Sequence, residues 1–368
     1  MAGDFDFMKR ALACAARGEG HTRPNPPVGA VIVKAGRIIG EGWHRRCGED
    51  HAEVAALKDA MRRAGKLRPG TSIENALSAV PHGFFAKAAV YVTLEPCSRP
   101  GRVGACCDAL IAAGVAKVVW AVPDPNPKNR GRAARRLRGA GIQCECWQGR
   151  IARADDAKRE CVAAAQSLIA PFAKHVTTGL PYVTVKLAMS LDGRICDASG
   201  DSKWMSSVAA RRATGLYRER VDVVMVGAET VRRDNPSLLS HGRRNDDLWR
   251  AVVSRSGKLP HDAQVFTDAA RDRTLVYRDA AEAIADLGRR GFLHVFCEGG
   301  LGLARSLVDA GLVDQWISVL CPMALGSRQL SNALKLERRG DATYGHDLLS
   351  MYAAPSIFRC KGRSRATS

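Results

Sequence analysis

The amino-acid sequence predicts two α/β domains in series, joined by a connecting helix. The chain has 368 residues, which suffices for two or three domains of about 150 residues each. Strand and helix patterns alternate along both halves, as is typical of layered α/β domains with a largely parallel sheet. We expect one domain over residues 1–149, a connecting helix or linker over 150–178, a second domain over 179–360 and a polar tail over 361–368.

The first half begins with an amphipathic pattern that predicts a helix over residues 5–18. A Pro-rich loop, two strands and a helix that opens at His51 follow. Residues 66–87 show no regular spacing of apolar residues and are expected to form a long loop. Two buried strands are expected at 88–94 and 115–122, with a helix between them that opens directly after a cysteine-rich loop.

The second half repeats the alternation of strands and helices. Its strand-like segments are rich in β-branched residues and are separated by helical patterns. In chain order these segments are YVTVKLAMS (182–190), VDVVMVG (221–227), WRAVVSRSG (249–257), RTLVYRD (273–279), FLHVFCEGG (292–300) and DQWISVLCP (314–322). This order of elements predicts a second α/β domain.

The strongly basic composition indicates which classes of ligand the chain can bind. The formal net charge of +19 suits either nucleic acid or a phosphorylated small molecule. Only 6% of the residues are aromatic, so few side chains can stack on bases, and we favour the small molecule. No apolar run approaches the ~20 residues that cross a bilayer, and the first residues, MAGDFDFMKR, lack the apolar segment of a signal peptide. We therefore expect a cytoplasmic protein without a membrane partner.

The twelve cysteines are expected to be reduced thiols, some of which bind a metal. His51 and Glu53 open a helix, Cys97 follows a strand, and Cys106 or Cys107 opens the next helix. One imidazole and two thiolates fill three of the four positions of a catalytic zinc ion and leave one for water. Zinc lowers the pKa of that water toward ~7, and Glu53 can shuttle its proton.

This pattern is typical of zinc-dependent nucleobase deaminases, which use H-x-E followed by P-C-x-x-C. His51, Glu53 and the Pro96–Cys97 pair match it, whereas the second cysteine lies nine positions beyond the first. The alternative is structural, with buried cysteines as small apolar side chains and His51 as a helix cap. The combination of H-x-E and E-P-C in one α/β domain favours the zinc site.

The motifs PNPPVGAVIV, GEGWH, HAEVAAL, YVTLEPCS, CCDALIAAGV and DPNP occur in that order. This series resembles the deaminase domain of the bifunctional riboflavin-biosynthesis pyrimidine deaminase/reductase family, which has the wider cysteine spacing. The resemblance implies a cytidine-deaminase-like three-layer α/β/α fold. It implies zinc ligation by His51, Cys97 and Cys106, with Cys107 packed in the helix. It also implies that Glu53 is the general acid and base and that the substrate contacts Asn25, His44 and Arg102.

Both halves of the chain depart in places from the pattern of this family. Arg99 stands where the family has His, and residues 103–105 read Val-Gly-Ala instead of Thr-Pro-Pro. In the second half, Ser254 replaces a usual acidic residue, and the stretch between Tyr277 and Gly291 is shorter than usual.

The second half resembles the reductase domain of the same family, which has a dihydrofolate-reductase-like α/β fold. The blocks that carry this resemblance are VKLAMSLDGRICDASGDSKWMSS, VDVVMVGAETVRRDNPSL and VFCEGGLGLARSL. The last is a strand, a Gly-rich turn and a helix, a geometry that can cradle phosphate or serve only as a tight turn. The resemblance implies a substrate side made by Lys186, Ser202, Arg218, Leu238 and Glu298. It implies an NADPH side made by Ala188, Trp204, Thr230, Asp234 and the turn from Gly300.

The leading hypothesis is therefore a bifunctional enzyme that uses Zn²⁺ and NADPH. It deaminates 2,5-diamino-6-ribosylamino-4(3H)-pyrimidinone 5′-phosphate and then reduces the ribosyl group to ribityl. A paralogue in the biosynthesis of an azapteridine such as toxoflavin, with an impaired reductase half, is the alternative. An RNA-editing deaminase and a zinc-stabilised scaffold without catalysis are further alternatives. We expect a homo-oligomer, either a dimer or a tetramer.

Overall fold

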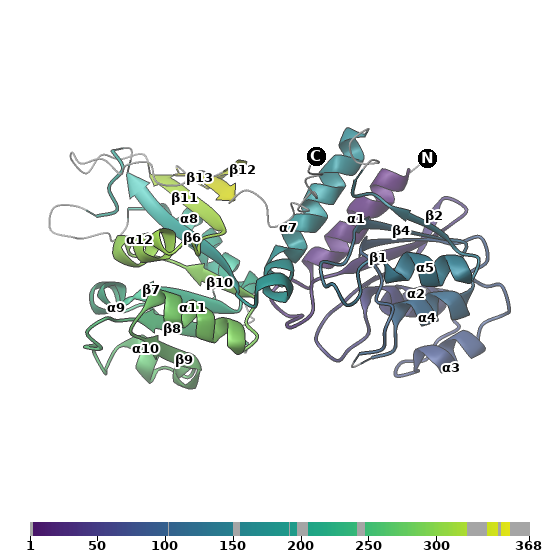
Figure 1. Ribbon diagram of the computed structural model, residues 1–368, viewed down its shortest axis with the longest axis horizontal. Coiled ribbons are helices and arrows are strands. Elements are labelled where there is room, and N and C mark those ends of the chain that lie inside the picture. Colours follow the sequence, from purple (N-terminus) through teal and green to yellow (C-terminus); the bar gives the residue numbers. More distant parts are fainter. Residues whose placement is uncertain are drawn as a thin grey trace, which may run out of the picture. The chain divides into compact units, whose positions relative to one another are not determined.

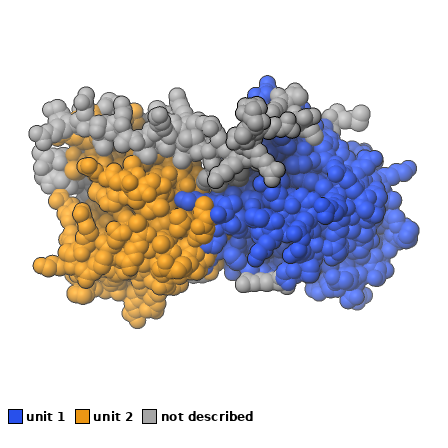
Figure 2. Space-filling model, viewed as in Figure 1, with its two compact units in different colours: residues 1–177 blue, residues 178–368 orange. Residues whose placement is uncertain are grey.

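The structure is a computed structural model, and it describes residues 3–101, 103–149, 155–190, 192–196, 205–240, 247–321, 337–344 and 347–353. The chain forms two units, Met1–Thr177 and Thr178–Ser368 (Figure 2). Each unit has its own sheet and core. The division falls within the segment where the sequence predicts the connecting helix, and the predicted polar tail lies outside the described residues. Within the described part, no helix is both long and apolar enough to cross a membrane.

The first unit contains five strands and a set of helices that follow the predicted alternation (Figure 1). In chain order these are α1 (Asp4–Ala16), β1 (Gly29–Lys34), β2 (Arg37–Trp43), α2 (Ala52–Arg63), α3 (Ile73–Ser78), β3 (Ala89–Leu94), α4 (Cys106–Ala113), β4 (Lys117–Val122), α5 (Arg132–Gly139), β5 (Gln143–Cys146) and α7 (Asp156–Thr178). Helix α3 corrects the expectation of a continuous loop over residues 66–87. Ser72 caps it by accepting a hydrogen bond from the Asn75 backbone, and Ala76 is buried.

The sheet of the first unit is mixed, so the prediction of a largely parallel sheet was wrong for this unit. Its strand order is β2-β1-β3-β4-β5, and β1 is antiparallel to both of its neighbours. Strands β3, β4 and β5 are parallel. The first two strands are joined only by Ala35 and Gly36, which both have positive φ angles of 51° and 73°. Such a two-residue turn can join only antiparallel strands.

The first unit has three layers. Helices α2, α4 and α5 cover one face of the sheet, and their apolar side chains form a core with alternate residues of β1, β3 and β4, including Ile32, Val92 and Trp120. Helix α1 packs on the other face, where the Phe7 ring lies 5.3 Å from that of Tyr91. Helix α7 lies beside α1 (Figure 1), and Lys9 and Glu160 link the two at 4.0 Å.

Two glycines let strand β2 approach helix α2 at backbone contact. A Cβ atom on Gly40 would lie 2.4 Å from the backbone oxygen of Ala56, and one on Gly42 would lie 2.3 Å from its nitrogen. Any larger side chain would therefore push the strand off the helix. This close approach brings His44, at the end of the strand, next to His51 at the start of the helix, with ring centroids 5.0 Å apart.

The second unit is built on an eight-stranded sheet with the order β12-β13-β11-β6-β10-β7-β8-β9. Strands β11, β6, β10, β7, β8 and β9 are parallel, whereas β13 is antiparallel to β11 and β12. The strands are β6 (Tyr182–Ser190), β7 (Val223–Gly227), β8 (Trp249–Val253), β9 (Thr274–Tyr277), β10 (His294–Cys297), β11 (Gln315–Cys321), β12 (Glu337–Tyr344) and β13 (Asp347–Ala353). The helices are α8 (Val208–Tyr217), η1 (Arg218–Arg220), α9 (Ala228–Asp234), α10 (Gln264–Thr267), η2 (Arg271–Arg273), α11 (Ala280–Arg289) and α12 (Leu301–Asp309).

Both faces of this sheet are buried, which explains why its central strands read as continuous apolar runs. Helices α11 and α12 pack on one face against alternate residues such as Val185, Met225 and Val295. A second cluster, which includes Val224 and Phe296, covers the opposite face. Because β10, β7, β8 and β9 are parallel, their carboxyl ends lie along one edge of the sheet. Ligands of α/β proteins bind at this edge.

A buried histidine lies in the middle of the second sheet. The Nε2 atom of His294 is 2.8 Å from the Thr184 hydroxyl, and the rings of Tyr182 and Tyr217 contact it edge-on. Burial lowers the pKa of His294 to about 3, against a smaller opposite effect of a hydrogen bond with the Arg220 backbone. The imidazole is therefore neutral in the folded unit at all pH values near neutrality.

We expect acid to weaken the second unit through His294. In the unfolded chain its pKa is about 6.5, so the unfolded state takes up a proton below pH 6.5 and the folded state does not. Lowering the pH from 7 to 5 should therefore remove about 2 kcal/mol of stability. Hydrogen exchange of the β6 and β10 amides, corrected for intrinsic rates, measures this loss. His294→Gln should flatten the pH dependence, while His261→Gln, at an exposed position, should retain it; equal slopes in both variants would refute the assignment.

Candidate active sites

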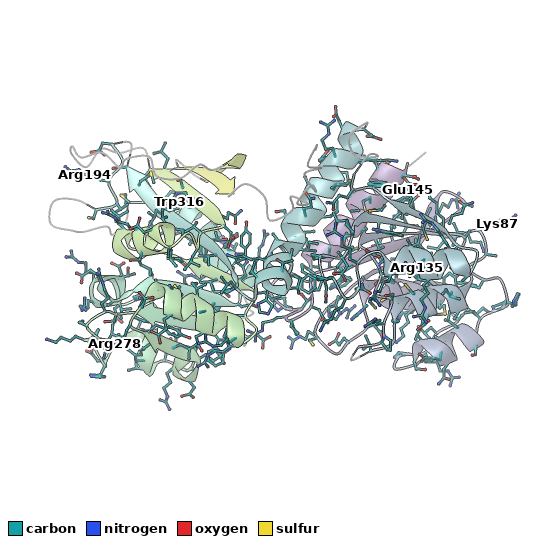
Figure 3. All side chains as sticks on the ribbon, viewed as in Figure 1. Lys87, Arg135, Glu145, Arg194, Arg278 and Trp316 are labelled. Carbon is teal, nitrogen blue, oxygen red and sulfur yellow. The ribbon has the colours of Figure 1, made fainter. Side chains whose placement is uncertain are left out.

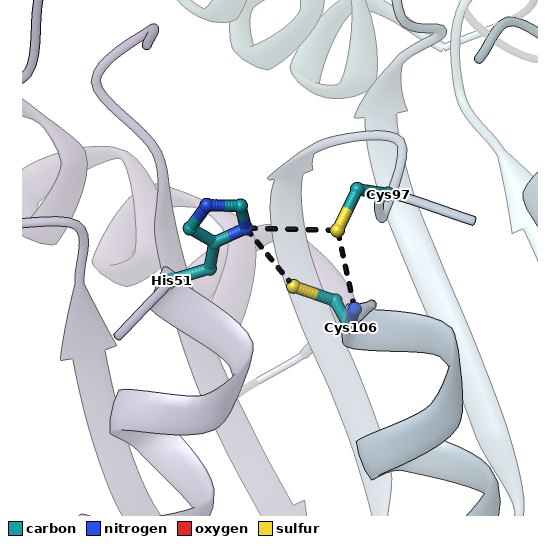
Figure 4. A group of neighbouring side chains, drawn as sticks. All are labelled: His51, Cys97 and Cys106. Carbon is teal, nitrogen blue, oxygen red and sulfur yellow. Dashed lines mark hydrogen bonds between the residues drawn. The ribbon is translucent and has the colours of Figure 1, made fainter. Parts of the chain in front are cut away.

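Three side chains converge where two helices of the first unit begin (Figure 4). His51 is the N-cap of α2, Cys106 is the first residue of α4, and Cys97 lies in the loop after β3. The Cys97 sulfur accepts a hydrogen bond from the Cys106 backbone N–H at 3.1 Å. The Cys97 backbone carbonyl accepts one from the Cys107 backbone N–H, also at 3.1 Å. Cys97 thus caps α4, and this cap fixes its sulfur beside that of Cys106.

The distances within this cluster fit a tetrahedral zinc ion. The His51 Nδ1 atom lies 3.6 Å from the Cys97 sulfur and 3.3 Å from the Cys106 sulfur, and all three ligand atoms lie within 4.8 Å of one another. Zn–S bonds of about 2.3 Å and Zn–N bonds of about 2.0 Å in a tetrahedron place N and S about 3.5 Å apart. The residues present therefore fit zinc in both donor type and spacing, with one position left for a non-protein ligand.

The electrostatic environment favours the ionised thiolate of Cys97, whereas it favours the protonated forms of Cys106 and His51. A hydrogen bond from Cys106 and another from His51 hold the pKa of the Cys97 thiol well below its usual range, although burial opposes this. The same shared proton and burial raise the pKa of Cys106. Burial would lower the pKa of His51, but the hydrogen bond with Cys97 and nearby negative charges raise it. A divalent cation would take the place of these protons, because metal ligands bind in their deprotonated forms.

Glu53 is the acidic residue in the first turn of α2, and its side chain is buried beside the cluster. Burial first, and then the negative charge of Cys97, raise its pKa to about 7. A carboxyl group with such a pKa can accept and donate a proton at neutral pH. Its position suits proton transfer to or from a group bound at the cluster.

Two of the three predicted substrate residues of this unit lie next to the cluster. The Asn25 amide contacts the His44 Nε2 atom at 3.0 Å, and the His44 Nδ1 atom lies 3.1 Å from the Asp50 carbonyl oxygen. Since a carbonyl only accepts, Nδ1 carries the proton and Nε2 accepts from the amide. Burial lowers the pKa of His44, so the ring is neutral. The third residue, Arg102, lies outside the described residues.

A buried polar cluster supports the Cys97 loop, and the sequence analysis did not identify it. The Glu95 carboxylate accepts hydrogen bonds from the backbones of Asp124, Gly131 and Ala133 at 3.0–3.2 Å. The Asn129 side-chain oxygen accepts from the backbone and hydroxyl of Ser98, both at 2.8 Å. The Glu-Pro pair before Cys97 and the DPNP motif were the available signals, but nothing in the sequence placed them together.

The second unit has a pocket of about 350 Å³ at the carboxyl ends of β7, β8 and β9 and the amino end of α12. Two of the predicted NADPH residues, Thr230 and Gly300, line it. Gly300 is the N-cap of α12, so the helix N-terminus lies at the pocket. A pocket of this size, edged by a helix N-terminus, fits part of a dinucleotide.

The other predicted residues of the second unit that the structure describes do not line this pocket. Arg218 and Glu298 form a nearly buried ion pair with N–O distances of 2.5 and 3.0 Å, and Arg218 also donates to the Leu239 carbonyl. Burial opposes the charge of Arg218, but Glu298 raises its pKa. Leu238 is buried in the apolar cluster of Val224, and Asp234 is the exposed last residue of α9.

Comparisons with known proteins decide the family. A family model described as the cytidine and deoxycytidylate deaminase zinc-binding region matches residues 1–122, and one described as the RibD C-terminal domain matches residues 181–348. The riboflavin biosynthesis protein RibD of Escherichia coli (strain K12) is 36% identical over 92% of this chain and 94% of its own. The chain belongs to the RibD family.

Solved structures of the RibD family have the same two-unit architecture. RibD from Acinetobacter baumannii superposes with a TM-score of 0.77 at 30% identity, covering 95% of this chain and 98% of its own. A diaminohydroxyphosphoribosylaminopyrimidine deaminase/5-amino-6-(5-phosphoribosylamino)uracil reductase from Thermotoga maritima superposes with a TM-score of 0.78 at 28% identity, with the same coverage. The predicted fold classes are thereby confirmed: a cytidine-deaminase-like first unit and a dihydrofolate-reductase-like second unit.

In this RibD-family chain, four more predicted reductase residues lie either on β6 or outside the described residues. Ser202 and Trp204 lie outside the described residues. Lys186 and Ala188 are half-buried on β6, two residues apart, so they share one face of the sheet. That face is opposite the one covered by α11 and α12, because Val185 and Leu187 pack there. Their predicted roles stay predictions.

Proposed function

We propose that this chain catalyses two successive steps of riboflavin biosynthesis. The first is hydrolytic deamination of 2,5-diamino-6-ribosylamino-4(3H)-pyrimidinone 5′-phosphate, and the second is reduction of the ribosyl group to ribityl. The observation that carries this proposal is the His51–Cys97–Cys106 cluster beside Glu53, in a chain that matches RibD proteins over more than nine tenths of its length. The comparisons do not favour an azapteridine or RNA-editing pathway.

In the deaminase unit, residues 1–149, we assign zinc binding to His51, Cys97 and Cys106. Zinc bound there would supply a water activated at neutral pH. Glu53 accepts a proton from that water and delivers it to the amino nitrogen that leaves as ammonia. Its buried carboxyl is suited to both steps because its pKa is about 7. Asn25, His44 and Arg102 are assigned to hold the pyrimidine and its attached groups.

In the reductase unit, residues 179–360, NADPH supplies the hydride that reduces C1 of the ribosyl group. Thr230, Gly300, Ala188, Trp204 and Asp234 are assigned to the coenzyme side. The substrate side is assigned to the residues Lys186, Ser202, Arg218, Leu238 and Glu298. The ion pair with Glu298 fixes the Arg218 guanidinium and leaves little conformational freedom to lose when a ligand binds.

The net charge of +19 supports a phosphorylated substrate, since positive charge steers anions toward a protein. A cytoplasmic location and a homo-oligomeric state, dimer or tetramer, stay predictions from the sequence. Cell fractionation tests the first, and sedimentation of the purified chain tests the second.

One assay tests both activities. The zinc-loaded chain is incubated with the diaminopyrimidinone phosphate, with and without NADPH, and the products are identified by mass. Without NADPH we expect a gain of about one mass unit, because oxygen replaces an amino group. With NADPH a further gain of about two mass units marks hydride transfer and protonation. An unchanged substrate would refute the deaminase assignment, and a deaminated but unreduced product would refute the reductase assignment.

A further inference from the structure

The pocket of the second unit has two chemically different ends. One end is the N-terminus of α12, with Gly300 and Gly302. The other end is formed by the turn after β8, with Ser254 and Arg255, and by Arg278 directly after β9. The sheet order β10-β7-β8-β9 separates the two ends by two or three strand spacings, or roughly 10–14 Å.

Ser254 carries a buried polar group that has no protein partner. The residue is 2% exposed, and its hydroxyl makes no hydrogen bond to any described residue. Its backbone is fixed, because its N–H donates to the Tyr277 carbonyl at 2.8 Å and its own carbonyl accepts from Gly257 at 3.0 Å. A buried hydroxyl without a protein partner is costly, so its presence in a pocket wall favours a bound polar atom, from a ligand or from water, that completes it.

Arg278 is held beside this hydroxyl by backbone contacts. Its Nη1 atom donates to the Arg255 carbonyl at 3.3 Å, and its guanidinium lies where a side chain on Gly257 would be, 2.3 Å from an ideal Cβ position. A side chain at position 257 would therefore displace the guanidinium from this place. Figure 3 shows Arg278 at the edge of the second unit, near the places where α9 and α10 are labelled in Figure 1.

In the part of the chain that the structure describes, the arginines at this end of the pocket are not paired with carboxylates, unlike the neighbouring Arg232. Arg232 also lines the pocket, but its guanidinium already donates hydrogen bonds to the Glu229 carboxylate at 2.7 Å and to the Lys258 carbonyl at 2.9 Å. Among the described residues, no ion pair joins a carboxylate to Arg255 or Arg278. Two guanidinium groups and an unpartnered hydroxyl therefore form a site for an anion with several oxygen acceptors.

We propose that Ser254, Arg255 and Arg278 bind the 2′-phosphate of NADPH and make this reductase select NADPH over NADH. The inference rests on the proposed reductase function and names the residues that choose its coenzyme. In dinucleotide-binding sheets, the pyrophosphate lies at a helix N-terminus, and an acidic residue further on binds the ribose 2′-hydroxyl of NADH, whereas arginine accommodates a 2′-phosphate. Here a serine and two arginines occupy the distant end of the pocket, and the turn after β8 has no carboxylate. Asp279 also lines this end, but its carboxylate accepts hydrogen bonds from the backbone N–H groups of Ala281 and Glu282 at the start of α11.

Coenzyme binding to the full-length chain tests the proposal without any turnover. The dissociation constants of NADPH and NADH are measured from coenzyme fluorescence for the wild type, Arg278→Ser and Arg271→Ser. Arg271 is exposed on η2, before β9, and so serves as a matched control for charge. Arg278→Ser should weaken NADPH binding at least tenfold and leave NADH binding within about twofold, because it removes a charge-assisted contact to a group that NADH lacks. Arg271→Ser should alter neither.

A second variant reverses the charge of the site. Ser254→Asp should repel the 2′-phosphate and accept a hydrogen bond from a 2′-hydroxyl, so the preference for NADPH over NADH should fall by at least a hundredfold. Equal weakening of both coenzymes by Arg278→Ser, or no change in either variant, would overturn the proposal. A wild-type chain that binds NADPH and NADH equally would overturn it while leaving the reductase function intact. A wild-type chain that binds neither coenzyme would instead overturn the proposed reductase function itself.

Discussion

A Glu53→Gln chain is expected to deaminate its substrate about 10²–10⁴-fold more slowly than the wild type. The amide keeps the size of the side chain but can neither accept nor release a proton at the buried position beside the cluster. Zinc content should stay unchanged, because Glu53 is not among the three grouped ligand residues. Reduction of the already deaminated substrate by NADPH should also continue, because it uses the second unit. The measurements are kcat for each half-reaction and zinc content by elemental analysis.

Glu74→Gln provides the matched control for this experiment. Glu74 also lies in the first turn of a helix of the same unit, but it is exposed. Its replacement should leave both half-reactions unchanged. Deamination at the wild-type rate in Glu53→Gln would reject a catalytic role for this residue and favour a scaffold without catalysis.

The adjacent cysteines at the start of α4 offer the second test, with the largest effect on the metal. Cys106→Ala should lose zinc and deamination together, because it removes one of three ligands. Cys107→Ala should keep both, since Cys107 lies among the apolar side chains of the core, where burial raises the pKa of its thiol to about 12. Elemental analysis of the purified variants and their deamination rates give the comparison.

Protein folding must be monitored in both cysteine variants. Circular dichroism should show folded chains, and NADPH-dependent reduction should persist in each, because the second unit has its own core. A Cys106→Ala chain with the zinc content of the wild type would remove Cys106 from the ligand set. Loss of zinc from Cys107→Ala would place the ligand at the neighbouring position instead.

The deaminase site could be predicted from sequence because its residues occupy helix starts. His51 and Cys106 each begin a helix that hydrophobic periodicity reveals, and the β-branched strand before Cys97 fixes where the loop starts. Spacing alone could not choose between Cys106 and Cys107. The structure separates them because the first sulfur faces His51, while the second side chain packs in the core.

The pocket of the second unit could not be derived in the same way. Ser254, Arg278 and Gly300 lie on different strand ends, and only the parallel register of β10, β7, β8 and β9 brings these ends to one edge. The mixed order of the first sheet was missed for a related reason. Strand periodicity reports which side chains are buried, but it does not report which strand lies beside which.

The Glu95 carboxylate has a consequence for how the metal is acquired. It holds three backbone N–H groups from the β4–α5 segment, and Asn129 of that segment holds Ser98 next to Cys97. The ligand loop is therefore anchored to the sheet by bonds that do not involve the metal. Zinc uptake in this chain should be a docking event at a preorganised site, in contrast to small zinc domains in which metal binding drives folding. The metal can then be exchanged while the deaminase unit stays folded.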